Sequence, residues 1–570
     1  MPNLDVSELN VVLSVLGAFI LLYGIISVKI KSRWYLGEAL PAVLMGIALG
    51  PLAARFLDSE RWGSAEKGQT NDITLGVTRV MIGVQLVIAG YQLPAKYNLK
   101  RWKEMALCLL PIMTIMWLCT TLCVLAAVPR VTLLAALVIA SCVTCTDPIL
   151  SQAIAKGPFA DKYVARPLRE IISSEAGAND GFGFPFLMLA VYLMRHADLP
   201  EPGVPAGEER VEGIPAKMLF AREDEVGRLG GGVGVAMKEW FLETWLYIVL
   251  LSVVYGAVVG YGSCRAIGFA LRRCVAPSCR GRSRNTRNEV ADINPRKWID
   301  GESHSLFPAA LGMFLVGTCG AIGTDDLLAC FVAGNALNWD GEYLAETERR
   351  HDEVSSCIDV LLNFGGFMYI GTVLPWSEFH DPEGVATGLT YGRLIGLGFL
   401  VLVLRRIPAI LLTYKLMPGV VRDWKEALFM GYFGPIGAGA VFYLEHSRHL
   451  FPEAGRGDGE ETELARAIGP VVYWLVLFSI VVHGLSIPAL NLAYTLMGVK
   501  PVQDDAREIR RMSERVATPV NAIPSGEDTF IAYNRFSRSV FDPLALPVSQ
   551  TAGGNKGFVL DDDDEKGRAR

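Results

Sequence analysis

The sequence predicts an all-α polytopic membrane protein, and three observations support this class. The 570 residues are 51% hydrophobic with a mean hydropathy of +0.33. The apolar residues fall in blocks of about 20, the length that crosses a bilayer as a helix. Two blocks are interrupted at mid-length by proline or glycine, and several carry charged residues. Such charges are tolerated in a membrane when they face a bundle interior or a water-filled path.

About thirteen ranges fit a transmembrane helix, although the eighth and ninth also fit one interrupted element. They are 9–29, 37–56, 74–93, 104–127, 131–155, 169–194, 239–260, 305–323, 325–338, 357–374, 389–414, 424–445 and 466–498. A transmembrane domain over 1–500 is thus followed by a cytosolic tail over 501–570. The polar composition of the tail predicts mostly disorder, with a short amphipathic piece at 507–515. The aromatic segment 530–541 fits either a docking motif or a spacer.

The loops predict the orientation of the chain. Basic residues follow the odd-numbered ranges, whereas the loops after the even-numbered ranges are acidic or mixed. Because Lys and Arg are enriched in cytosolic loops, the N-terminus is predicted outside and the C-terminus in the cytosol. The mostly acidic loop 340–353 is an exception to this pattern.

The fifth and twelfth ranges are predicted to be discontinuous helices. Thr146-Asp147-Pro148 interrupts the fifth and Gly434-Pro435 the twelfth, and proline removes an amide donor and clashes with the preceding turn. Broken helices at membrane depth occur where the freed backbone is buried in protein or lines a cavity. Because the breaks hold equivalent places in ranges 1–6 and 8–13, we predict two inverted repeats whose broken helices cross at mid-membrane.

The sixth range carries three polar residues at its middle. Glu175 and Asn179 are four residues apart and share one helix face, and Asp180 lies about a quarter turn from Asn179. A single Asp-Pro kink, as in the fifth range, fits a structural bend as well as an ion site. Two successive acid-bearing ranges favour an ion site.

Further charged residues lie within the apolar ranges. Arg405 and Arg406 are too deep in the eleventh range for both to reach the interface, so one of them is expected to pair with a buried carboxylate. Glu175 is the first choice for this partner and Asp359 the alternative.

Asp325 and Asp326 open the ninth range, either as a helix cap or as part of an ion path. No cofactor, nucleic-acid partner or enzymatic activity is expected. An intramembrane aspartyl protease would require Gly-x-Gly-Asp, whereas residues 177–180 are Gly-Ala-Asn-Asp.

Six motifs together carry a resemblance to a known family, and they cover about residues 10–495 in the family's order. They are T-D-P-I-L-S-Q, S-S-E-A-G-A-N-D-G-F-G-F-P-F, G-T-D-D-L-L-A-C-F-V-A-G-N-A-L-N-W, L-R-R-I-P-A-I, F-G-P-I-G-A-G-A and V-V-H-G-L-S-I-P. This set resembles the fungal plasma-membrane Na⁺/H⁺ antiporters of the monovalent cation/proton antiporter superfamily. The resemblance implies a plasma-membrane homodimer that exchanges cytosolic Na⁺, often also Li⁺ or K⁺, for external H⁺. Such exchange would serve salt tolerance and pH homeostasis.

The resemblance also implies roles for individual residues. It places the ion-binding group at Asp180, Asn179, Asp147 and Thr146, with Na⁺ held at Asp180 and Thr146. It places the buried ion pair at Glu175 and Arg406, in preference to Arg405. The sequence departs from the family at Ala176, because related antiporters commonly carry a serine there. Ser173, Ser174, Thr146 or water would then supply the missing oxygen, and the ion preference stays open.

The expected mechanism is competition between a cation and a proton for Asp180, with alternating access. If Arg406 neutralises Glu175 permanently, one free carboxylate implies one proton per cation; if Glu175 titrates together with Asp180, the ratio is higher. The alternative function is a non-transporting membrane sensor of ions or pH, with the tail as its signalling part. In either case the tail is expected to bind regulatory partners.

Overall fold

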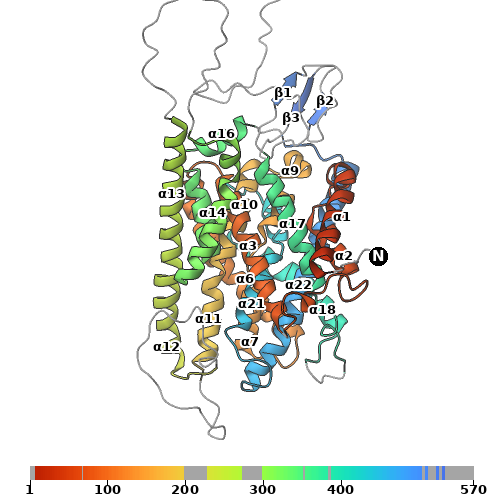
Figure 1. Ribbon diagram of the computed structural model, residues 1–570, viewed down its shortest axis with the longest axis vertical. Coiled ribbons are helices and arrows are strands. Elements are labelled where there is room, and N and C mark those ends of the chain that lie inside the picture. The colour runs from red at the N-terminus through yellow and green to blue at the C-terminus, as the bar shows by residue number, and fades with distance from the viewer. Residues whose placement is uncertain are drawn as a thin grey trace, which may run out of the picture.

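The computed structural model describes residues 7–66, 68–197, 227–272, 298–350, 353–382 and 387–502, and three short strands of the tail. The helices run roughly along one direction in an elongated bundle (Figure 1). All regular structure up to residue 502 in the described ranges is helical, which confirms the predicted all-α class.

The first half of the bundle contains α1 (Glu8–Val28), α2 (Ala39–Leu49), α3 (Gln69–Tyr91), α4 (Tyr97–Lys100), α5 (Trp102–Leu107), α6 (Met113–Ala127), α7 (Leu133–Cys142), α8 (Pro148–Ala155), α9 (Pro158–Tyr163), α10 (Arg166–Phe182) and α11 (Phe184–Arg195). The second half contains α12 (Gly232–Glu239), α13 (Leu250–Arg272), α14 (Gly301–Ile322), α15 (Asp326–Leu337), α16 (Glu342–Arg349), α17 (Val354–Thr372), α18 (Tyr391–Leu404), α19 (Ile407–Thr413), α20 (Trp424–Tyr432), α21 (Ala438–Arg448) and α22 (Gly459–Leu496). Wider or tighter helical turns are η1 (Lys29–Arg33), η2 (Ser59–Arg61), η3 (Cys108–Ile112), η6 (Trp240–Val249) and η8 (Tyr414–Leu416).

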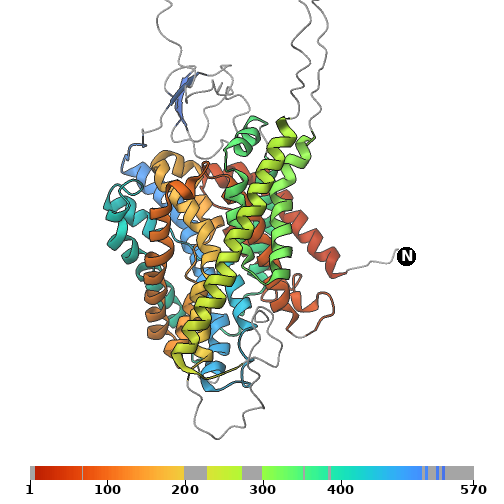
Figure 2. The same cartoon turned by 90° about the vertical axis from the view of Figure 1, so that its left-hand side faces the viewer.

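Eight helices of the described chain are long and apolar enough to cross a membrane, by length and composition. Each of the thirteen predicted ranges falls on one helix or on a pair of consecutive helices. The longest apolar stretch runs without a gap from α12 through η6 to the end of α13. In Figure 2 this stretch, drawn in yellow-green, runs the full height of the bundle.

The helices pack in two groups. In one group α3 packs against α14 and α15, α2 against α17, and α13 against α15. In the other group α7 packs against α6, α11 and α22, while α18 packs against α6 and α22. The contacts of α21 with α3 and of α10 with α15 join the two groups. Helix α7 of the first broken span therefore lies within the second group, while α10 and α21 lie where the groups meet.

Two predicted ranges that looked continuous are broken in the structure. The sixth is divided at Gly183, between α10 and α11, because Pro185 has no N–H to donate to the carbonyl four residues earlier. The eleventh is divided at Arg405 and Arg406, between α18 and α19, where Pro408 has the same effect. These prolines were not recognised as interruptions in the sequence.

The described part of the tail is a small sheet that the sequence did not predict. Strands β1 (Arg507–Arg510), β3 (Thr529–Ala532) and β2 (Ala522–Pro524) pair in that order, and both pairings are antiparallel. The backbone N–H of Val502 donates to the Lys162 carbonyl of α9 at 2.8 Å, which ties the chain before the sheet to the bundle. The rest of the tail lies outside the described residues, as does most of the aromatic segment 530–541.

The strands, α9 and α16 lie at one end of the bundle, whereas α12 lies at the other (Figure 1). Helix α16 belongs to the acidic loop that disagreed with the positive-inside pattern. Within it Glu346 accepts a hydrogen bond from Arg350 at 2.6 Å, so part of the acidic charge is paired. The loop thus shares its end of the bundle with the basic segment around α9.

Candidate functional site

The two broken helices meet each other at their breaks. Helix α7 ends at Cys142 and α8 begins at Pro148, while α20 ends at Tyr432 and α21 begins at Ala438. The Asp147 backbone N–H of the first break donates to the Pro435 carbonyl of the second at 2.8 Å. The fifth and twelfth spans are therefore discontinuous and in direct contact, as the sequence predicted.

Asp147 caps both half-helices that begin at the crossing. Its Oδ1 accepts the backbone N–H groups of Ile149 and Leu150 at 2.8 and 2.9 Å, and its Oδ2 accepts that of Ala438 at 2.7 Å. A Cβ at Gly437 would collide with this carboxylate. The first N–H groups of a helix have no partner within it, and a negative charge there is favoured by the helix dipole. Asp147 meets both needs for α8 and α21.

Arg405 serves the two half-helices that end at the crossing. Its guanidinium donates to the Val143 carbonyl and to the Gly434 carbonyl, both at 2.7 Å, and to the Cys145 carbonyl at 3.4 Å. A positive charge is favoured at the C-terminal end of a helix. The crossing thus holds an anion between two helix starts and a cation between two helix ends.

The Asp147→Asn variant tests the capping role. Asparagine has one acceptor oxygen where aspartate has two, and its amide would face a backbone N–H of one half-helix. We expect the free energy of unfolding to fall by about 1–3 kcal/mol. Thermal unfolding in detergent measures this quantity. The matched control is Asp423→Asn, because Asp423 caps α20 at the exposed end. A loss of stability no larger than that of the control would contradict the capping role of Asp147.

Asp180 is fully buried in α10, and neither of its carboxylate oxygens has a hydrogen-bond partner among the described residues. Its backbone carbonyl and that of Gly181 accept from the Tyr443 hydroxyl of α21. A Cβ at Gly439 would lie 2.8 Å from Oδ1 of Asp180, so only glycine leaves room for the carboxylate there. A buried ionised group without partners is strongly disfavoured, which makes Asp180 the best candidate for binding an ion.

Asn179 connects α10 to the first break. Its amide nitrogen donates to the Thr146 hydroxyl at 2.8 Å, and its oxygen accepts the Thr146 backbone N–H at 3.1 Å. Both side chains are buried. This pair holds the Asp180 turn of α10 against the crossing.

Glu175 and Arg406 form a buried pair with two parallel hydrogen bonds of 2.6 and 2.7 Å. The Arg406 Nε also donates to the Met430 carbonyl at 3.0 Å. Arg405 points to the carbonyls of the crossing instead. Ala176, next to Glu175, is buried and contributes no side-chain oxygen.

The secondary candidates are in different surroundings. Ser174 donates to Asn98 at 2.6 Å, whereas the buried Ser173 hydroxyl has no partner in the part of the chain that the structure describes. Asp359 accepts from Gln85 at 3.0 Å and is not the arginine partner that the sequence left open.

Asp325 caps α15 by accepting the Leu328 N–H at 3.0 Å. Of the two roles that the sequence left open, a helix cap or part of an ion path, this contact matches the helix cap. Asp326 pairs with Arg79 of α3. The sequence analysis missed Arg79, although a charge inside the apolar range 74–93 gave the same signal as Arg405 and Arg406.

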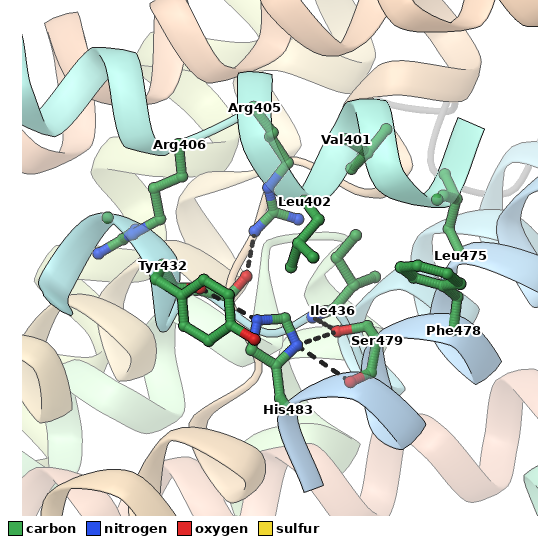
Figure 3. A pocket seen from close by; sticks show the side chains of 13 residues that line it. Val401, Leu402, Arg405, Arg406, Tyr432, Ile436, Leu475, Phe478, Ser479 and His483 are labelled. Atoms are coloured by element: carbon green, nitrogen blue, oxygen red, sulfur yellow. Dashed lines mark hydrogen bonds between the residues drawn. The ribbon is translucent and has the colours of Figure 1, made fainter. Parts of the chain in front are cut away.

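A cavity lies behind the crossing, between α18, α20 and α22 (Figure 3). Its polar wall includes Arg405, Arg406, Tyr432, Ser479 and His483. Its apolar wall is formed by leucine, valine and phenylalanine side chains of α18 and α22.

Comparison with known proteins agrees with this architecture. A family model described as "Sodium/hydrogen exchanger, transmembrane" matches residues 16–492. The chain is 32% identical over 509 residues to Na(+)/H(+) antiporter 2 of Zygosaccharomyces rouxii, covering 87% of this chain and 54% of that protein. It is 32% identical over 502 residues to a Na(+)/H(+) antiporter of Saccharomyces cerevisiae, covering 86% of this chain and 44% of that protein. The chain therefore spans about half the length of these curated relatives.

A Na(+)/H(+) antiporter of Schizosaccharomyces pombe is matched over 91% of its length at 29% identity, covering 86% of this chain. Among solved structures, the sodium proton antiporter MjNhaP1 from Methanocaldococcus jannaschii shares the fold with a TM-score of 0.52 at 15% identity. That match covers 84% of this chain and 100% of the solved one. The family match over residues 16–492 shows that the chain belongs to the sodium/hydrogen exchanger family.

Proposed function

We propose that the chain is a secondary active antiporter that exchanges cytosolic Na⁺ for external H⁺ by alternating access. The observation that most supports this proposal is the fully buried Asp180 carboxylate. It has no hydrogen-bond partner in the described chain and lies beside the crossing of the broken helices. An unpaired carboxylate at this depth is stable when it binds either a proton or a cation. Mutually exclusive binding of the two at one group, exposed to each side in turn, produces exchange.

The ligands proposed for Na⁺ are oxygens around Asp180. Thr146 and Asn179 are held together next to it. Of the two serines before Ala176, Ser174 is bonded to Asn98, so Ser173, whose hydroxyl has no partner in the described chain, is the one proposed to supply an oxygen. Asp147 uses both its oxygens as caps, so we assign it to support of the site. Li⁺ and K⁺ are the other monovalent ions to be tested.

A non-transporting sensor is the second function considered. A sensor that transports no ion would not need a buried cation and a buried anion to stabilise paired half-helices at the centre of the bundle. The Arg405 contacts with the Val143 and Gly434 carbonyls therefore favour a transporter. The printed names of the relatives describe Na⁺/H⁺ antiporters, which favours the same choice.

The setting of the exchanger is proposed on the same basis. The basic segment around α9 shares one end of the bundle with α16 and the tail strands, which we assign to the cytosol (Figure 1). The N-terminus is then outside. We also propose a homodimer in the plasma membrane, whose tail binds regulatory partners.

Flux in proteoliposomes tests the function. We expect the purified chain to dissipate a preset pH gradient when Na⁺ is added outside, with Li⁺ and K⁺ tested in turn to establish the ion preference. Vesicles without protein and vesicles with choline in place of Na⁺ are the controls. A chain that is folded and inserted but moves protons with none of the three ions would contradict the proposal.

The exchange ratio is expected to be one cation for one proton. Arg406 neutralises Glu175 through two hydrogen bonds, which leaves Asp180 as the one exchanging carboxylate of the proposed site. Asn179 cannot bind a proton in exchange. With ion gradients fixed, the rate and reversal point should not respond to a membrane potential set by valinomycin and K⁺, provided that the flux assay shows K⁺ is not transported. A reversal point that shifts with voltage would mean more than one proton per cation and would contradict this ratio.

A further inference from the structure

The last motif of the sequence, V-V-H-G-L-S-I-P, has no role in the exchange as proposed so far. It lies on α22, and its His483 lines the cavity behind the crossing together with Ser479, one turn earlier. Figure 3 shows both side chains directed at the second break, between Tyr432 and Ile436.

The two side chains contact both edges of the break between α20 and α21. The Ile436 backbone N–H donates to Oγ of Ser479 at 2.7 Å. Oγ of Ser479 lies 3.1 Å from Nδ1 of His483, and Nε2 of His483 lies 3.0 Å from the Tyr432 carbonyl. Nδ1 also lies 3.0 Å from the carbonyl of Ser479 in its own helix.

The hydrogen bonds place Ser479 and His483 between the two edges of the break. The Ile436 N–H can only donate, so Oγ of Ser479 accepts it. The Tyr432 and Ser479 carbonyls can only accept, so the imidazole hydrogen goes to one of them, from Nε2 or from Nδ1. With the hydrogen on Nε2, Nδ1 accepts from the Ser479 hydroxyl, and the two side chains link Tyr432 to Ile436.

The break depends on such partners because it lies outside any regular helix. Buried backbone N–H and carbonyl groups cost free energy when they have no partner. Between Tyr432 and Ile436 lie Gly434, whose carbonyl binds Arg405, and Pro435, whose carbonyl binds the Asp147 backbone. The α22 side chains therefore fix both ends of the segment that carries the crossing contacts.

We propose that Ser479 and His483 are positioning residues that set the geometry of the second break and, through it, the affinity of the exchanger for Na⁺. The path to the ion site is short. Helix α21 starts two residues after Ile436, and its Gly439 is packed against the Asp180 carboxylate. A shift of the break moves this glycine relative to Asp180. The proposal rests on the proposed antiport function.

Ser479→Ala tests the proposal with Ser486→Ala as its matched control. Ser486 lies on the same helix and also contacts Tyr432, but through the tyrosine hydroxyl at 2.6 Å and not through the break backbone. A net contribution of one hydrogen bond corresponds to a change of about three- to tenfold in an equilibrium constant. We expect Ser479→Ala to raise the KM for Na⁺ in proteoliposomes by about this factor, and Ser486→Ala to leave it unchanged. Vmax per folded protein should change less than KM in both variants.

A second pair of variants separates positioning from packing. His483→Gln can keep an amide donor toward the Tyr432 carbonyl and should retain most of the Na⁺ affinity, whereas His483→Leu should raise KM as Ser479→Ala does. If His483→Leu does not fold, the two variants of Ser479 test the proposal, because both keep a small side chain on the helix. Ser479→Ala should raise KM, and Ser479→Thr, which keeps the hydroxyl, should restore the parental value. Equal KM values for Ser479→Ala, Ser486→Ala and the parent would overturn the proposal. A parent chain without Na⁺-dependent flux would instead overturn the antiport function itself.

Discussion

The Asp180→Asn variant is expected to abolish exchange while the protein remains folded and in the membrane. Asparagine keeps the shape of the side chain but binds no proton and carries no charge for the cation. Because the carboxylate makes no hydrogen bonds in the described chain, its replacement removes no structural contact. The measurement is dissipation of a pH gradient on addition of Na⁺ to proteoliposomes, with thermal unfolding of the same preparation as the check on folding.

Glu243→Gln is a suitable control, because Glu243 is a partly buried carboxylate of η6 that accepts from Tyr192 at 2.7 Å and lies outside the proposed site. Its flux should equal that of the parent. If Asp180→Asn exchanges Na⁺ for H⁺ at the parental rate, Asp180 is not the shared site.

The largest loss of stability is expected from breaking the pair of Glu175 and Arg406. Removing one partner leaves the other charge buried, which costs roughly 3–5 kcal/mol. Glu175→Ala and Arg406→Ala should therefore each lower the melting temperature clearly, and the double variant should lose less than the sum of the two. Unfolding in detergent, analysed as a double-mutant cycle, measures this coupling.

The exposed pair of Glu453 and Arg456, with 3.3 Å between charged atoms, provides the control cycle. Surface ion pairs are screened by water and contribute little, so its variants should unfold close to the parent. Additive losses for Glu175 and Arg406 would contradict the role of their hydrogen bonds in stability.

The breaks of the fifth and twelfth spans could be predicted from the sequence because their causes are local. Pro148 lacks the N–H that would continue a helix, and Gly434-Pro435 does the same in the second half. The breaks at Gly183 and at Arg405 have the same local cause, in Pro185 and Pro408. They were missed because only one or two residues lie outside helix at these breaks, so the apolar pattern continues through them.

The roles of Arg405 and Arg406 could not be separated from the sequence alone. They are consecutive, but the break between α18 and α19 sends one guanidinium to the carbonyls of the crossing and the other to Glu175. Which residue takes which partner depends on the packing of α10 and α20, which are distant in sequence. The tail strands were missed for a similar reason, because β1 pairs with residues about twenty positions later in the chain.

The sequence predicted which residues form the candidate site, but not which contacts each of them makes. Asp180 and Glu175 stand out because charge inside an apolar span is costly. The sequence gives no sign that Asp147 has both oxygens occupied by backbone N–H groups while Asp180 has neither. That difference comes from two half-helices that start at Asp147 and from a glycine of α21 that faces Asp180.

Proton release on Na⁺ binding is the most direct test of a carboxylate shared by the two ions. Purified protein in detergent is titrated with NaCl by calorimetry in two buffers of different ionisation enthalpy, at a pH where the parent exchanges. The difference between the two heats gives the number of protons released per Na⁺ bound. We predict about one proton from the parent, as competition at a single carboxylate requires, and neither Na⁺ binding nor proton release from Asp180→Asn. Na⁺ binding by the parent without proton release, or equal release from Asp180→Asn, would contradict competition at Asp180.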